Sequence, residues 1–179
     1  MGNSDEERLM ASIEPLGGDV AVSFDADEAR ILRGLLTEMK DLIDQEAAVD
    51  DAVIDRLFPA AYAQPEDAQS FRALVGDELK AGKRSALSSV LSVLGDDGDV
   101  AVTVPRSEID RWLTALTDVR LALGTRFEVT EEKMAAELDP DDPGAGAMAI
   151  LHWLGWMQEA MIGAITERTE PMMETDHDD

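Results

Sequence analysis

A five-residue pattern of small, polar and apolar residues, GDVAV, occurs twice in the chain, and a helical pattern of apolar positions follows each copy. The first copy spans Gly18 to Val22 and the second spans Gly98 to Val102. Each follows a glycine-rich turn and alternates apolar with small or polar residues, which indicates a short β-strand. An isolated two-stranded ribbon is marginal in water. We therefore predict that the copies pair into a two-stranded β element, residues 19–24 and 99–104, packed on helices, in a direction left open.

Apolar residues at helical spacing predict helices after both copies. After the first, an acidic turn precedes a stripe from Ile31 to Ile43. After the second, Ser107 and Asp110 resemble a capping box, and Gly124 is a candidate C-cap. Further helical patterns cover residues 49–57, 66–94, 130–138 and 145–165. The predicted fold class is mainly α: a single helical domain of about five to seven helices with the two-stranded element.

Length and composition favour one domain. The 179 residues are 45% hydrophobic, enough for one buried core. We expect an N-terminal variable segment at 1–16, one α-rich domain at 17–168, and an acidic disordered tail at 169–179.

Charge and cysteine content exclude several classes of function. Fifteen basic against 39 acidic residues give a formal charge of −24, which disfavours direct binding to nucleic acid. The absence of cysteine excludes disulfides, thiolate metal sites and thiol nucleophiles. Glu159 lies within the apolar stretch 145–165 and disfavours a membrane span there. We expect a cytoplasmic protein that has no membrane segment.

No motif for catalysis, cofactor binding or metal binding stands out. His152 has no second histidine or cysteine at ligand spacing, and no serine or glycine loop has a catalytic or phosphate-binding context. We therefore predict no catalytic residues, no cofactor and no metal, and a non-enzymatic protein.

Two clusters are candidates for binding a partner protein. Arg120 borders an apolar stripe, so it either forms a buried ion pair with Glu159 or is displayed to a partner together with Arg126. Trp153 and Trp156 share roughly one helix face, which serves either as core or as an exposed aromatic surface.

Five blocks of sequence, in order, resemble an actinobacterial domain-of-unknown-function family labelled AosR-like, an oxidative-stress regulator family. The blocks are EARILRGLL, DRLFPAAYA, FRALVGDELKAGKRSAL, RWLTALTDVRLALGTRFEVTEE and AILHWLGWMQEAM, and the resemblance covers about residues 19–165. It implies a helical cytoplasmic protein, genes that neighbour a Clp protease adaptor and sulfur-metabolism genes, and a transcriptional partner of a sigma factor. The redox role in that family is tied to a cysteine pair, which this chain lacks.

Three hypotheses follow. The leading one is a regulatory or adaptor protein whose partner, by resemblance, is a sigma factor, RNA polymerase or a Clp component. Its candidate contact residues are Arg120, Arg126, Trp153 and Trp156. The first alternative is a small-molecule-binding protein or enzyme with a pocket near Arg120, His152 and Glu159. The second is a structural homodimer through the Trp/Met-rich helix.

Overall fold

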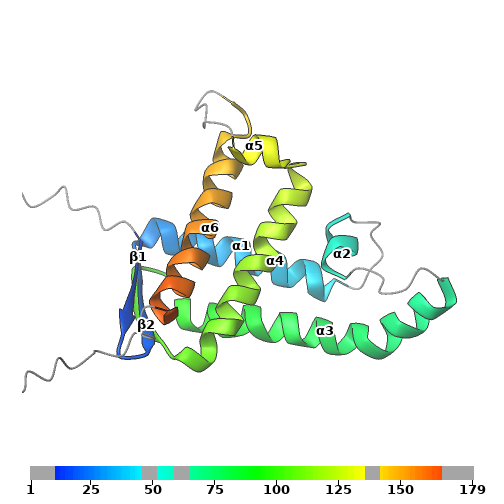
Figure 1. Ribbon diagram of the computed structural model, residues 1–179, viewed down its shortest axis with the longest axis horizontal. Helices are drawn as coiled ribbons and strands as arrows, with labels where there is room; N and C mark the ends of the chain where they lie inside the picture. The colour runs from blue at the N-terminus through cyan, green and yellow to red at the C-terminus, as the bar shows by residue number, and fades with distance from the viewer. Residues whose placement is uncertain (1–10, 46–51, 59–64, 136–141, 167–179) are drawn as a thin grey trace, which may run out of the picture.

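A computed structural model describes residues 11–45, 52–58, 65–135 and 142–166, and the side chains of these ranges except 65–76. The described part of the chain is mainly helical, with six helices and a three-stranded sheet (Figure 1). The elements are β1 (Ser12–Leu16), β2 (Asp19–Phe24), α1 (Ala26–Asp44), α2 (Ala52–Leu57), α3 (Pro65–Leu94), β3 (Val100–Val104), the 3-10 turn η1 (Arg106–Glu108), α4 (Ile109–Arg126), α5 (Glu131–Ala135) and α6 (Ala145–Thr166). The predicted tail at 169–179 lies outside the described residues.

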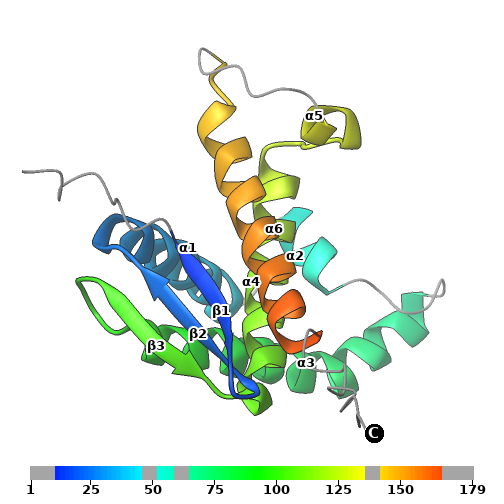
Figure 2. The same ribbon diagram turned by 60° about the vertical axis from the view of Figure 1, so that its left-hand side comes forward.

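The two GDVAV copies pair with each other. β2 and β3 are antiparallel, with Val20 opposite Val104 and Val22 opposite Val102, which confirms the predicted pairing and settles its direction. The prediction of only two strands is wrong, because β1 joins the other edge of β2 in the order β1-β2-β3 (Figure 2).

The missed strand, β1, lies within the predicted N-terminal variable segment. Its sequence, SIEPL, contains a proline and a glutamate and so lacks the apolar alternation that marks a strand. Gly17 and Gly18 connect it to β2 with φ angles of 61° and 113°, which an L-amino acid with a side chain rarely adopts. The tight turn at Gly17 and Gly18 therefore places β1 beside β2, although the composition of β1 does not favour a strand.

The sheet has one buried face and one open face. Val20, Val22 and Phe24 of β2 are at most 3% exposed and pack with Val100 and Val104 on the helices. Burying a side chain of this size contributes about 1.5–3 kcal/mol. On the opposite face, which no helix covers in either view, β2 and β3 carry the small residues Ala21, Ser23, Ala101 and Thr103 (Figures 1 and 2).

A complete capping box begins α1. The backbone amide of Glu28 donates to Asp25 Oδ1 at 2.8 Å, and the amide of Asp25 donates back to Glu28 Oε2 at 3.0 Å. Two amides that the helix itself leaves unpaired are thus satisfied, as the acidic turn in the sequence predicts.

Helix α4 lies at the centre of the fold, in contact with α1, α2, α3 and α6. The predicted Ser107–Asp110 capping box does not form, because Ser107 lies within η1, and Glu108 precedes α4 without a side-chain cap. The predicted end at Gly124 is also wrong. The helix continues through Arg126 and closes when the amides of Glu128 and Val129 donate to the carbonyls of Thr125 and Gly124.

Candidate functional site

Helix α6 is apolar on nearly every side, but only one side is buried. Leu151, Leu154, Met157, Met161 and Ala164 face the core. The opposite side is exposed and consists of Ala149, His152, Trp156, Glu159 and Ile162, which we call the outer face of α6. A helix that is apolar all round is usually covered on all sides. The outer face of α6 is therefore the first candidate for a binding surface.

None of the helices in the described ranges combines the length and apolar composition needed to cross a membrane.

The two candidate tryptophans of α6 occupy different environments. Trp153 is half-buried, and its ring meets Phe24 of β2 edge-on, with centroids 6.1 Å apart. Trp156 is 41% exposed. Residues three apart on a helix differ by about 60° in direction, so Trp153 turns toward the sheet while Trp156 stays on the outer face. Of this pair, only Trp156 is exposed on the surface.

Arg120 of α4 is held against α6 by Gln158 and not by Glu159. Its Nη1 donates to Gln158 Oε1 at 2.6 Å. The guanidinium also lies close to Gly155, where a Cβ would be 3.4 Å from Nη2. Glu159 is exposed, because one position along a helix rotates a side chain by about 100°. The predicted buried ion pair is replaced by a charged hydrogen bond to an amide.

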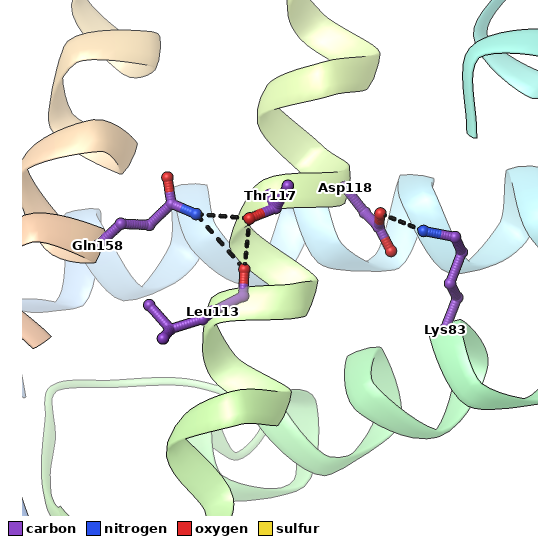
Figure 3. Close-up of polar contacts among 5 residues, drawn as sticks. All are labelled: Lys83, Leu113, Thr117, Asp118 and Gln158. Carbon is purple, nitrogen blue, oxygen red and sulfur yellow. Dashed lines mark hydrogen bonds and ion pairs between the residues drawn. The ribbon is translucent and has the colours of Figure 1, made fainter. Parts of the chain in front are cut away.

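Gln158 joins α6 to α4 through both ends of its amide. Its Nε2 donates to Thr117 Oγ1 at 2.7 Å and to the carbonyl of Leu113 at 3.4 Å (Figure 3). The Thr117 hydroxyl in turn donates to the Leu113 carbonyl at 2.7 Å. Only one feature of the sequence points to this residue: Gln158 is a polar position within the mainly apolar stretch 145–165.

A buried ion pair lies on the other side of α4 and was not predicted. Lys83 Nζ of α3 is 2.5 Å from Asp118 Oδ1, and the two side chains are 13% and 4% exposed (Figure 3). The ammonium also lies 5.9 Å from the centre of the Phe58 ring. Burial raises the pKa of the Asp118 carboxyl, and the hydrogen bond and charge of Lys83 offset part of that increase.

The second oxygen of Asp118, Oδ2, is buried and has no hydrogen-bond partner within the described residues. Nor do histidine, aspartate and glutamate form a group that could hold a metal ion anywhere in the described ranges. The Lys83–Asp118 ion pair links α3 to α4.

Arg126 lies apart from the other candidate residues. It is at the end of α4, on the side of α1, with Nη1 3.9 Å from Glu38 Oε2. Arg120 instead lines an open hollow of about 810 Å³ between α2 and the end of α4, together with Arg56 and Glu128. His152 and Glu159 do not line this hollow; both are exposed on the outer face of α6. The three residues of the predicted pocket therefore do not converge on the hollow beside Arg120.

These features define a mainly helical domain with a small antiparallel sheet and a helix face that exposes Trp156 and Ile162. The chain belongs to a family described as "Domain of unknown function (DUF2017)", which matches residues 10–165. This confirms the family predicted from the five sequence blocks.

Distant curated relatives carry a functional name. The chain is 28% identical over 127 residues to the oxidative stress regulator AosR of Mycobacterium tuberculosis (strain ATCC 25618 / H37Rv), and equally to the protein of that name from Mycobacterium bovis. The match covers 63% of this chain and 57% of each relative, so the chain spans little more than half their length. No solved structure gives a significant match.

Proposed function

We propose that this protein is a non-enzymatic regulator that binds another protein through the outer face of α6. The observation that carries the proposal is the exposure of two large apolar side chains, Trp156 (41%) and Ile162 (50%), on one face of a mainly apolar helix. The name of the distant relatives, an oxidative stress regulator, supports a regulatory role.

The surroundings of Trp156 suit a binding surface. Tryptophan is enriched among the residues that dominate binding energy at protein interfaces. Behind it, the Gln158 hydrogen bonds hold α6 on α4, and Trp153 packs on the sheet. A partner would therefore meet a surface that is already ordered, which lowers the entropy lost on binding.

The partners we propose are a sigma factor, RNA polymerase or a Clp component, as the family resemblance implies. Direct contact with nucleic acid is disfavoured by the formal charge of −24. Because the 179 residues include no cysteine, binding should not depend on the thiol redox state of this chain.

The test is direct binding to purified host sigma factors, RNA polymerase and Clp components, measured by biolayer interferometry. We expect Trp156→Ala to weaken the interaction at least about tenfold, the effect of a tryptophan at the centre of an interface. Phe127→Ala is the matched control, because Phe127 is 50% exposed but follows α4 and lies outside the outer face of α6. Equal weakening by both variants, or none by Trp156→Ala, would refute the assignment.

The same variants test the homodimer alternative. Light scattering of the protein alone should show a monomer. A dimer that Trp156→Ala dissociates would instead make a second copy the occupant of the outer face of α6, and would replace the regulatory proposal with a structural one.

A further inference from the structure

The two edges of the sheet differ in how they are protected. The β1 edge carries Glu14 and Pro15, and α6 packs along this strand (Figure 2). At the other edge, β3 has the sequence VAVTV, without proline, glycine or charge. Its register with β2 runs one-to-one over all five residues, without a bulge. Natural proteins protect edge strands with the devices that β1 has and β3 lacks.

Side-chain burial along β3 indicates room for another strand. Val100 and Val104 are buried, while Val102 between them is only partly covered. On the open face, Ala101 and Thr103 are small and exposed, and they line a hollow of about 340 Å³ that crosses all three strands. A fourth strand at this edge would complete the cover of Val102 and place its own side chains over Ala101 and Thr103.

Charge at the ends of β3 is asymmetric. Asp96, Asp97 and Asp99 precede the strand, are exposed, and make no side-chain hydrogen bond or ion pair with the rest of the described residues. Arg106 follows the strand at its other end and is exposed. The Arg33 guanidinium donates to the carbonyls of Asp97 and Gly98 and offsets one of these three negative charges, while Arg106 donates to the carbonyl of Ile165. An added strand would thus meet a net negative charge at one end and a single positive charge at the other.

We propose that the β3 edge binds an extended basic segment of another protein as a fourth, antiparallel strand. Strand addition uses the free backbone groups of an edge for affinity and the alternating side chains for specificity. In the antiparallel direction, lysine or arginine at the C-terminal end of the segment lies beside Asp96, Asp97 and Asp99. A second copy of this chain fits less well, because each copy carries a charge of −24.

The proposed β3 site does not involve the outer face of α6. Two peptides of identical composition test it. One has five alternating threonine and valine residues followed by two lysines, and the other has the two lysines first. Fluorescence anisotropy with the full chain should give at least about fivefold tighter binding of the peptide with C-terminal lysines, because only its charges lie beside the aspartates. The difference should shrink as salt is added.

Two changes separate strand pairing from simple charge attraction. The triple variant Asp96→Asn, Asp97→Asn, Asp99→Asn should remove the preference between the peptides while leaving the fold intact, since these side chains have no partners to lose. In the peptide, N-methyl groups on one alternate set of residues should abolish binding and those on the other set should not, because only alternate amides face β3.

Several results would overturn the proposal: no binding at millimolar peptide, equal affinity for both peptides, or indifference to N-methylation. A dimer of the protein alone that the peptide dissociates would also overturn it, in favour of a second copy. Trp156→Ala should leave peptide binding unchanged, so a failure here and a failure of the α6 proposal are distinguishable.

Discussion

Replacing Lys83 by methionine should expose how strongly the buried ion pair controls the stability of the fold. Methionine keeps the length and packing of the lysine stem but removes the ammonium that lies 2.5 Å from Asp118 Oδ1. The Asp118 carboxyl, 4% exposed, would then be buried without a cation. We expect a large loss of folding free energy whose size depends on pH.

The magnitude follows from the two ways in which the protein can respond. An unpaired buried charge costs about 3–5 kcal/mol. Protonating the carboxyl instead costs about 4 kcal/mol at pH 7 and about 1.5 kcal/mol at pH 5, because an unfolded aspartate has a pKa of about 3.9 and each pH unit is worth about 1.36 kcal/mol. The cheaper response sets the loss, so Lys83→Met should cost about 3–4 kcal/mol at neutral pH and about 1.5 kcal/mol or less at about pH 5.

The direction of the pH dependence follows from the raised pKa of Asp118. A carboxyl whose pKa is higher in the folded state contributes stability that is fully present below its unfolded pKa and is lost as pH rises through its folded pKa. Lys83 lowers the pKa of Asp118, so removing Lys83 raises that pKa further. The variant should therefore differ most from the wild type at neutral pH and least in acid.

Other titrating carboxyls should largely cancel in this comparison. Lys40 and Arg84 lower the pKa of Asp44, which adds stability that is present above its unfolded pKa and is lost as pH falls through its folded pKa. Both proteins share that contribution. The difference between them therefore reports on Asp118.

Urea unfolding followed by far-UV circular dichroism measures the effect at both pH values. Lys40→Met is the matched control, because Lys40 pairs with Asp44 at 2.8 Å at the solvent-facing surface, where an ion pair contributes little to stability. The double variant Lys83→Met, Asp118→Leu should recover most of the loss. A cost below about 1 kcal/mol at neutral pH, or one that does not change with pH, would refute the reasoning.

Three further substitutions test other parts of the fold by the same unfolding assay. Arg33→Ala should cost about 2 kcal/mol, because the guanidinium donates to the carbonyl of Leu94, which ends α3, and to those of Asp97 and Gly98 just before β3. Arg30→Ala, which loses only an exposed pair, should cost about 0.5 kcal/mol or less. Glu128→Gly should stabilise by about 0.5–1 kcal/mol, because Glu128 has a φ of 47° where glycine is favoured, and a loss of stability would contradict the assigned helix end. Gly155→Ala should stabilise by up to about 1 kcal/mol, because the new methyl would be in ordinary contact with Arg120, and a clear loss would contradict the packing around this guanidinium.

The pairing of the two GDVAV copies was predictable because strand alternation, flanking turns and repetition agree. β1 was not predictable from its own residues, since its stability comes from pairing with β2 and from α6 rather than from composition. The same limit applied to the end of α4. Glu128 adopts a left-handed conformation that local preference disfavours, and the hydrogen bonds that the amides of Glu128 and Val129 donate to the helix end stabilise it.

The sequence pattern indicated which side chains were candidates for the site, but not which side chains they would contact. Periodicity placed Arg120 beside the apolar stripe, yet Gln158 and Glu159 are neighbours in the sequence, and only the rotation of α6 decides which one reaches it. The sequence also gave no indication that Lys83 and Asp118, on helices distant in sequence, would meet. Contacts between elements depend on how the helices pack, which local patterns do not specify.

A regulatory role in oxidative stress would require a group other than a cysteine thiol of this chain to detect the oxidant, because the 179 residues contain no cysteine. Oxidation of the two buried methionines of α6 is a poor substitute on structural grounds. Met157 and Met161 are fully buried beneath the outer face of α6, and a sulfoxide there would place a polar oxygen in the core. Oxidant would reach them only after α6 had separated from the core, so their oxidation would follow unfolding rather than signal to a partner. If the proposed partner responds to oxidant, binding to the outer face of α6 should therefore change with the partner's oxidation state and not through oxidation of Met157 or Met161.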